Sequence, residues 1–532
     1  MNNRKIFPII LLIIILFIAG FFRFFDLDSI PLGLYPDVAI NGNDALDTLQ
    51  SKNFKVFYPE NNGREGLFFW VVALSFYIFG PSIWAIKFTA AVFGFFTILG
   101  IYLLAKEISK TLNYDNFKSD LISLFSTFFA AISFWHTLFS RLGFRAIMVP
   151  FFIVFGFYFL FKGLNKKDRN YILFIISGFF FGLGFYSYIS YRFVVMIGII
   201  VLIPWLIIYK KNNELKSFAT AVLLLFLAVI IFALPIGIYF LENPEDFFGR
   251  AAGVSVLQSE NPIKESVKSF ISHLAMFNFY GDANWRHNYS GSPMLLWPVG
   301  ILFLLGIIIS LIRVFTSLKV KDYYSFSVFI FLTAWFFIML LPGFLSSEGI
   351  PHSLRVIGVI PVVFIFSGFG AEFIYAKIKK YYRKPLFLNL FIIAVCLSLI
   401  WIEFYKYFYS WANNPEVSYA YSEDLFEIGA YINTLDDEAE IYVIVNYDGV
   451  RVPYPDGVPM PAQTPMFIER TKFLKTRAVY ITPDEINKIE IENNGYVIPL
   501  HQDKELENKL IDIFKDLTIE KYNKFVVYKI NN

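Results

Sequence analysis

Acidic, basic and histidine side chains recur in the loops of this chain, close to the points where long apolar runs begin or end. In the first such loop, Asp37 follows a proline and Asp44 lies in a short amphipathic stretch. A carboxylate held near a membrane surface can act as general base on an acceptor hydroxyl. The same residues also suit a helix start, with Asn43 or Asp44 as the cap and Asp37 in a turn. Spacing alone leaves both interpretations open.

Basic residues flank two further apolar segments. Arg64 and Glu65 precede the apolar run that starts at Gly66, and Arg141 and Arg145 border a later one. Arginine binds phosphate oxygens in a bidentate manner, so these positions suit a phosphate site. Anchoring of long side chains at a membrane interface explains the same pattern equally well.

Two later loops add a mixed set of polar side chains. Asp282, Arg286 and His287 lie close together in one of them, and His352 and Arg355 lie in the next. Such a mixture suits a sugar or phosphate site, and it also suits an ordinary structured loop. A histidine without a neighbouring ligand in the sequence is weak evidence for a metal. We therefore assign no metal ligands here, and the need for a divalent metal stays open.

The elements that carry these loops are membrane helices. Hydrophobic residues make up 57% of the chain, 65 residues are phenylalanine, and the mean hydropathy is +0.56. About eleven apolar runs are long enough to span a bilayer. The net charge of +3 gives no indication of a nucleic-acid partner. The single cysteine, Cys396, excludes a disulfide framework within the chain.

Lysine-rich loops alternate with lysine-poor ones, which predicts the orientation of the spans. Arg4 and Lys5 precede the first run, Ile6 to Phe22, so we expect a cytoplasmic N-terminus and a retained first span. The loops with the candidate site residues then share the outer face. The run from Gly66 to Phe79 is short for a span, and we expect a partly inserted or juxtamembrane helix there.

Composition changes near Ser410, where charged residues become frequent and apolar runs shorten. We expect a membrane domain at 1–409 and a small extracytoplasmic α/β domain at 410–532. Its predicted helices are Ser422 to Leu435 and Leu506 to Phe514, and Arg451 to Pro465 is predicted to be a loop. Its predicted strands are Glu440 to Val445, Ala478 to Ile481, Tyr496 to Leu500 and Lys524 to Ile530.

The spans are nearly free of charge at their centres. A transporter would be expected to place ionisable groups at mid-membrane and to show repeated halves with broken helices. Neither feature is evident in the sequence. The pattern therefore favours chemistry at the outer interface.

The order of these motifs resembles that of the GT-C membrane glycosyltransferases. The resemblance is strongest to the protein O-mannosyltransferase and aminoarabinose transferase group, whose prokaryotic members are described as dolichyl-phosphate-mannose-protein mannosyltransferase-like. It rests on Asp37 after the first span, on the run Arg64 to Trp70, and on Ser140-Arg141 with Gly143 and Arg145. It covers about residues 6 to 409. The chain departs from the family pattern at Val38, which replaces an acid, and in lacking a Pro-Pro pair after Arg64.

The resemblance implies an all-α polytopic membrane protein of GT-C type with a small C-terminal α/β domain. It implies transfer of a sugar, with inversion, from a polyprenyl-phosphate donor to a hydroxyl of a protein, lipid or glycan acceptor at the outer face of the cell membrane. Asp37 would be the general base. The donor phosphate would bind to arginines, namely Arg64, Arg141, Arg145, Arg286 and Arg355. The acceptor or sugar would contact Asp44, Glu65, Asp282, His287 and His352.

Two other classes of function stay open from the sequence. One is a transporter of lipid-linked saccharides, which would tolerate the loss of Asp37. The other is a non-catalytic protein that keeps the GT-C scaffold as a binding or assembly partner, and it predicts normal folding without turnover of any sugar donor.

Overall fold

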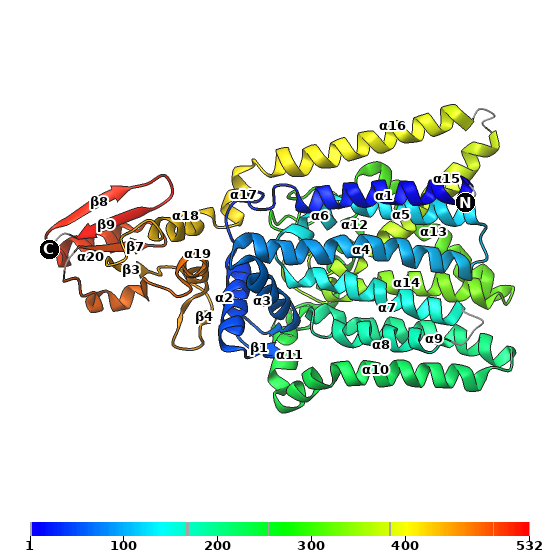
Figure 1. Ribbon diagram of the computed structural model, residues 1–532, viewed down its shortest axis with the longest axis horizontal. Coiled ribbons are helices and arrows are strands. Elements are labelled where there is room, and N and C mark those ends of the chain that lie inside the picture. Colours follow the sequence, from blue (N-terminus) through cyan, green and yellow to red (C-terminus); the bar gives the residue numbers. More distant parts are fainter. Residues whose placement is uncertain (1–2, 166–169, 254, 382–384, 493, 531–532) are drawn as a thin grey trace. The chain divides into compact units, whose positions relative to one another are not determined.

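The computed structural model describes residues 3–165, 170–253, 255–381, 385–492 and 494–530 (Figure 1). Two of the lysine-rich loops expected on the cytoplasmic side lie partly outside the described residues, at Lys166, Lys167, Arg169, Arg383 and Lys384. Contacts divide the chain into unit 1, comprising Met1–Leu27 and Ala90–Asn413, and unit 2, comprising Asp28–Thr89 and Asn414–Asn532. The first loop therefore groups with the C-terminal segment. The division into 1–409 and 410–532 stays a prediction.

Unit 1 is built almost entirely from helices, and α4 crosses the boundary between the units along the chain. The helices are α1 (Asn3–Phe24), α4 (Ile83–Thr111), α5 (Asn116–Ile132), α6 (Phe134–Arg141), α7 (Met148–Asn165), α8 (Ile172–Gly184), α9 (Val194–Lys211), α10 (Leu215–Glu242), α11 (Pro244–Gly253), α12 (Pro262–Ala275), α13 (Trp297–Lys319), α14 (Tyr323–Phe344), α15 (Ile360–Tyr381) and α16 (Pro385–Phe404).

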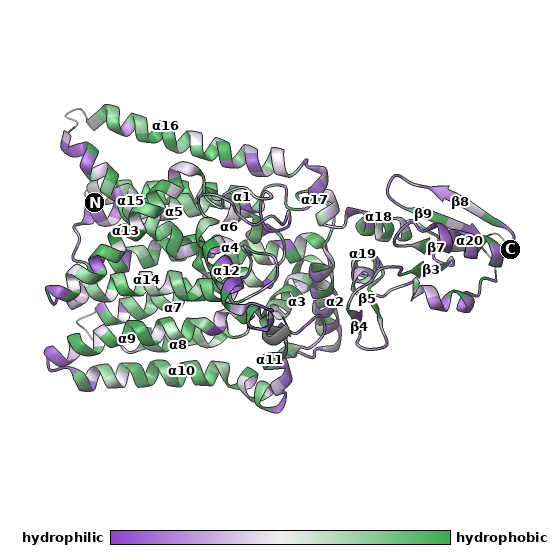
Figure 2. Cartoon of the chain, turned by 180° about the vertical axis from the view of Figure 1, so that it is seen from behind, coloured by the Kyte–Doolittle hydropathy of each residue, from purple (hydrophilic) through white to green (hydrophobic). Residues whose placement is uncertain are grey.

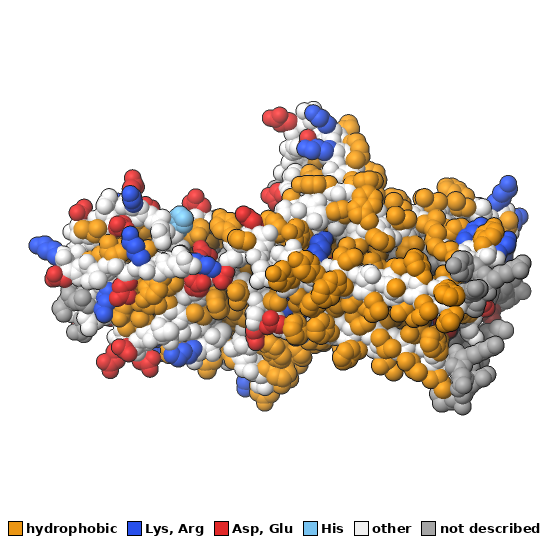
Figure 3. All heavy atoms as spheres, turned by 90° about the horizontal axis from the view of Figure 1, so that it is seen from above, with side chains coloured by type: hydrophobic (Ala, Val, Ile, Leu, Met, Phe, Trp, Pro, Cys, Tyr) orange, Lys and Arg blue, Asp and Glu red, His pale blue; other side chains and the backbone are white. Residues whose placement is uncertain are grey.

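The predicted polytopic membrane protein is confirmed. Among the described residues, nine helices are long and apolar enough to cross a membrane. The pair α5 and α6, bent by 57°, would form a tenth span, and α8 is a shorter apolar helix. Apolar colouring runs along the long helices in Figure 2, and hydrophobic side chains cover much of their surface in Figure 3. Segment Leu67–Phe79 is a short apolar helix, α3.

Glycines allow some of these helices to approach closely. A Cβ atom on Gly306 of α13 would lie 1.9 Å from the carbonyl oxygen of Phe366 in α15. In return, a Cβ atom on Gly370 of α15 would lie 2.0 Å from the carbonyl oxygen of Leu302. Small residues at such crossings let backbones meet and gain van der Waals contact where lipid offers no hydrophobic driving force.

We expect Gly306→Ala to destabilise the protein, because the added methyl group must displace the backbone of α15. Overpacking of this kind costs about 1–3 kcal/mol. The matched control is Gly237→Ala in α10, where an added Cβ has nothing within 4 Å. Thermal unfolding in detergent should show a lower midpoint for the first variant only. Equal midpoints for both variants would contradict the close contact.

Unit 2 combines two helices from the first loop with a sheet from the C-terminal segment. Its helices are α2 (Pro36–Ser51), α3 (Leu67–Phe79), α17 (Pro415–Ala420), α18 (Glu423–Ile432), α19 (Gln463–Phe473) and α20 (Lys504–Ile513). Its strands are β1 (Phe57–Tyr58), β2 (Arg64–Glu65), β3 (Glu440–Ile444), β4 (Arg451–Val452), β5 (Val458–Pro459), β6 (Val479–Ile481), β7 (Gly495–Pro499), β8 (Leu517–Lys521) and β9 (Val526–Ile530).

The main sheet has the order β6-β3-β7-β9-β8. Strand β3 is parallel to β6 and β7, and β9 is antiparallel to β7 and β8. Ile428 of α18 packs in one core with Val443, and Leu510 of α20 packs in a second core with Val497. The small α/β domain expected from the sequence is confirmed as a fold, with apolar residues buried on both faces of the sheet.

The predicted strands and both predicted helices are confirmed within a few residues. Helices α17 and α19 and strand β8 were not predicted from the sequence, and the segment predicted as a loop also contains β4 and β5. Strand β8 carries no fully buried residue, so its apolar pattern is weak. Helix α19 holds Pro465 in its first turn, where proline is tolerated because the N–H of that position has no partner within the helix.

Candidate functional site

Asp37 lies in the first turn of α2, directly after Pro36. Its Oδ1 atom accepts a hydrogen bond from Nδ2 of Asn61 at 3.0 Å, and the side chain is partly exposed. The helix begins at Pro36, so the interpretation of Asn43 or Asp44 as its cap is wrong. The positive end of a helix dipole favours a charged carboxylate in the first turn. Asp37 is thus a partly exposed acid in the first turn of a helix.

Arg64 connects β2 to α2 within unit 2. Its side chain is 1% exposed, and its NH2 group lies 2.6 Å from Oδ2 of Asp44. Its NH1 group donates to Asn41 at 3.1 Å, and Nε donates to the carbonyl of Glu60 at 3.1 Å. Burial raises the pKa of Asp44, while Arg64 opposes that rise. Glu65 beside it is also buried. The binding roles expected for these residues stay predictions.

Arg141 closes the C-terminal end of α1 within unit 1. The side chain is fully buried at the end of α6. Its NH1 group donates to the carbonyls of Phe22, Arg23 and Phe25, and its NH2 group donates to the carbonyl of Asp26 at 2.8 Å. The last carbonyls of a helix have no partner within the helix, and a cation satisfies both them and the dipole. Arg141 is therefore engaged by backbone rather than open to a ligand.

Arg23 performs the reciprocal task at the bend between α5 and α6. It donates to the carbonyls of Ala130 and Ala131, at the C-terminal end of α5, and to Nδ1 of His136 at 2.7 Å. No role was predicted for Arg23. In the sequence it is simply an arginine directly after the first apolar run, and the structure places it in the last turn of α1.

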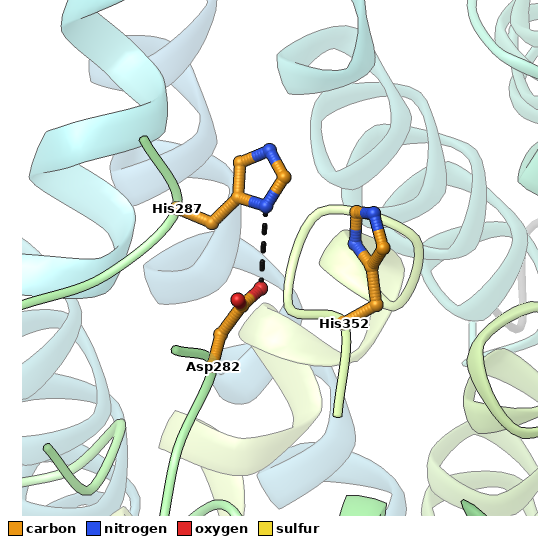
Figure 4. A group of neighbouring side chains, drawn as sticks. All are labelled: Asp282, His287 and His352. Atoms are coloured by element: carbon orange, nitrogen blue, oxygen red, sulfur yellow. Dashed lines mark ion pairs between the residues drawn. The ribbon is translucent and has the colours of Figure 1, made fainter. Parts of the chain in front are cut away.

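The structure brings together three site residues predicted from two separate loops, Asp282, His287 and His352 (Figure 4). Their ligand-type atoms all lie within 4.8 Å of one another. Nδ1 of His287 is 3.3 Å from Oδ2 of Asp282, and the two imidazole rings lie 4.8 Å apart, centre to centre. Asp282 is 3% exposed and His287 is 6% exposed. The contacts with acceptor or sugar expected for these three residues stay a prediction, and the sequence did not predict that they lie together.

Backbone contacts hold the loop that carries Asp282 and His287. The carbonyl of Asp282 accepts from the backbone N–H of Gly291 at 2.9 Å and from Nδ2 of the buried Asn288 at 3.2 Å. A Cβ atom on Gly281 would lie 2.1 Å from the carbonyl oxygen of Ser292. The segments on either side of this loop, at 281–282 and at 291–292, thus lie against each other. This contact fixes the backbone at Asp282 and with it the direction of its side chain.

The loop that carries His352 is held against the side chain of Asp282 by hydrogen bonds. Oδ2 of Asp282 accepts from the backbone N–H of Ser353 at 2.8 Å and from its hydroxyl at 3.0 Å. The backbone N–H of His352 donates to Nε2 of His273, at 3.1 Å, and Nδ1 of His273 hydrogen-bonds to the carbonyl of Ser269. His273 therefore has a partner at each ring nitrogen.

The electrostatics of the cluster follow from its burial. Burial alone would raise the pKa of Asp282, but the imidazoles of His287 and His352 outweigh it and lower that pKa. Burial lowers the pKa of His352 well below its ordinary value, and Arg355 and His287 add to this shift. Asp282 is thus held ionised and His352 neutral near pH 7.

The remaining three arginines are partly exposed. Arg145 lies over the ring of Tyr188 at 5.1 Å, and Arg286 donates through Nε to Asn284. Arg355 pairs with the exposed Glu348 at 3.1 Å. Unlike Arg64 and Arg141, these side chains are not fully buried, and their predicted contact with a phosphate stays a prediction.

Comparison with known proteins gives the fold its context. Residues 66–238 match the family model described as dolichyl-phosphate-mannose-protein mannosyltransferase. The crystal structure of ArnT from Cupriavidus metallidurans in the apo state superposes with a TM-score of 0.53 at 12% identity, covering 99% of this chain and 98% of ArnT. The chain has the GT-C fold. The resemblance expected from the sequence is confirmed at that level.

Two further structures are similar to this GT-C chain. ArnT bound to undecaprenyl phosphate gives a TM-score of 0.52 at 12% identity, with 97% of each chain covered. The oligosaccharyltransferase of Archaeoglobus fulgidus, tethered to an acceptor peptide, gives a TM-score of 0.49 at 15% identity, covering 83% of this chain and 62% of that one. No curated protein sequence matches the chain.

Proposed function

We propose that this GT-C protein is a membrane glycosyltransferase that moves a sugar from a polyprenyl-phosphate donor to an acceptor hydroxyl. The observation that carries the proposal is the structural match to ArnT over nearly the whole length of both chains. ArnT has been crystallised with undecaprenyl phosphate, a polyprenyl phosphate. The family match over residues 66–238 supports a donor of the same chemical class.

Asp37 is the proposed general base. It is partly exposed, sits in the first turn of α2, and Oδ1 accepts from Asn61. Its Oδ2 atom makes no hydrogen bond within the described part of the chain. In the proposed step, Asp37 takes the proton of the acceptor hydroxyl while the oxygen attacks the anomeric carbon. The bond from that carbon to the phosphate oxygen breaks, and the polyprenyl phosphate leaves with inversion at the sugar.

Partly exposed arginines are the proposed partners of the departing phosphate. Arg145, Arg286 and Arg355 all belong to unit 1, and each presents part of its side chain to solvent. A fixed cation stabilises the charge that develops on a leaving phosphate. Among the five arginines predicted for this role, these three are the partly exposed ones.

The membrane helices offer room for hydrocarbon. An apolar cavity of about 150 Å³ lies among α7, α8, α9 and α10, with Leu160, Phe181, Ile199 and Phe226 in its lining. Apolar surface of this kind favours a hydrocarbon chain over water. The cavity suits part of a polyprenyl tail.

The orientation of the chain in the membrane is also part of this proposal. A cytoplasmic N-terminus places the loop with Asp37 and the C-terminal α/β domain on the extracytoplasmic side. Nucleotide sugars are not supplied there, whereas a lipid-linked sugar is. The acceptor is a hydroxyl of protein, lipid or glycan.

Sugar transfer in reconstituted membranes tests the proposal. Purified protein in liposomes receives a panel of polyprenyl-phosphate sugars carrying labelled sugar, together with native lipid and protein extract as acceptors. We expect label in an acceptor with polyprenyl-phosphate donors and none with nucleotide sugars. Folded protein that transfers no label from any donor, while the extract serves a known transferase, would contradict the proposal and favour a transporter or a scaffold.

A further inference from the structure

We propose that Asp282, His287 and His352 bind one divalent transition-metal cation of the zinc class. All three residues lie in unit 1, so the site is complete within that unit. The proposal is independent of glycosyl transfer, because it concerns metal binding and holds for a transporter or a scaffold as well.

The spacing of the side chains matches a tetrahedral site. Zinc lies about 2.0–2.2 Å from nitrogen and oxygen ligands, so neighbouring ligand atoms in a tetrahedron are about 3.3–3.6 Å apart. Oδ2 of Asp282 and Nδ1 of His287 are already 3.3 Å apart. His352 completes a set whose atoms all fall within 4.8 Å, and Figure 4 shows its ring beside the other two side chains.

Two ring nitrogens in the cluster are buried without a well-formed hydrogen bond. Nδ1 of His352 is inaccessible to solvent and forms no hydrogen bond with the residues that the structure describes, and the equally inaccessible Nδ1 of His287 has only the ion-pair contact with Oδ2 of Asp282 at 3.3 Å. Buried polar atoms almost always have a partner. A cation at the centre of the cluster would occupy both lone pairs and would also neutralise the carboxylate.

Neighbouring groups hold the proposed ligands in position. Ser353 donates twice to Asp282, through its backbone N–H and its hydroxyl. Its hydroxyl also lies 3.2 Å from the carbonyl of His287. Hydrogen bonds of this outer kind orient metal ligands and raise metal affinity. His273, whose two nitrogens are occupied, supports the backbone of His352 and is not a ligand.

The ligand set selects the class of cation. Two imidazoles and one carboxylate suit Zn²⁺ and similar ions, whereas Mg²⁺ and Ca²⁺ prefer oxygen ligands throughout. Three protein ligands leave one tetrahedral position open for water or for an oxygen of a bound anion. The cation would also link the loop before α13 to the loop before α15.

Metal content of the full-length protein tests the proposal. Protein purified without a histidine tag is loaded with Zn²⁺, desalted and measured by elemental analysis, beside His287→Gln, His352→Gln and the control His501→Gln. The control removes an exposed histidine in unit 2. We expect about one zinc per wild-type and control chain. Zinc affinity should fall by more than about 100-fold in the other two variants, because even outer-shell groups contribute 10- to 100-fold.

Cobalt substitution provides a readout that needs no variant. Wild-type protein stripped with chelator and titrated with Co²⁺ should develop the intense visible absorption of tetrahedral Co²⁺ at one equivalent, and Zn²⁺ should abolish it. Wild-type protein that retains no zinc and develops no such absorption would overturn the proposal. Zinc retained equally by all four proteins would overturn it as well, since the metal would then sit elsewhere.

Discussion

Asp37→Asn is expected to lower the rate of sugar transfer by about 10²–10⁴-fold, the usual contribution of a general base. Asparagine keeps the shape of the side chain and a hydrogen-bonding group for Asn61, but it cannot accept the acceptor's proton. The measurement is the initial rate with a polyprenyl-phosphate sugar in liposomes, with donor binding measured separately. We expect a reduced kcat and retained donor binding.

The matched control for this experiment is Asp47→Asn. Asp47 lies on the same helix, is mostly exposed and pairs with Arg470. The Asp47→Asn variant loses the same charge as Asp37→Asn, and its rate of sugar transfer should remain close to that of the wild type. Transfer by Asp37→Asn at the wild-type rate would move the base to Asp44 or Asp282.

Arg141→Met is expected to reduce the stability of the protein by about 3 kcal/mol or more. The variant removes the donor to four carbonyls at the end of α1, and each buried unpaired polar group costs about 1–3 kcal/mol. Methionine retains much of the apolar stem of the side chain. Unfolding in detergent, followed by helical circular dichroism, measures the loss.

Arg355→Met serves as the control for Arg141. It removes the same charge from a partly exposed residue whose partner, Glu348, is exposed. Exposed ion pairs contribute about 0–1 kcal/mol, so its unfolding should stay near that of the wild type. If the two variants are equally stable, Arg141 does not cap α1 as the structure indicates.

The architecture was predictable because its signals are local. Apolar runs of membrane length predict spans wherever they occur, and the alternation in Glu440–Ile444 predicts a buried strand without knowledge of its neighbours. Helix α19 and strand β8 escaped prediction because their sequences carry little apolar periodicity. The grouping of 28–89 with the C-terminal segment depends on contacts between distant parts of the chain.

The residues of the candidate site were named from the sequence for their types and places in the loops, and their roles stay predictions, whereas their partners could not be predicted. No second histidine that could share a metal ion lies close to His287 in the sequence. His352 comes near it because the backbone N–H of Ser353 donates to Asp282 and so holds the later loop there. Arg141 has the sequence environment of a phosphate ligand. Its partners include backbone carbonyls at the end of α1 and directly after it, and a sequence does not show which backbone groups a side chain will contact.

The reciprocal caps of Arg23 and Arg141 have a consequence for biogenesis. The first span emerges from the ribosome with a charged side chain and unpaired carbonyls at its end, and their partners are in α5 and α6, which are synthesised later. Water at the membrane interface can satisfy helix-end carbonyls until a protein partner is present. The contacts that fix the end of the first span therefore form only after α5 and α6 have been synthesised and have packed against it.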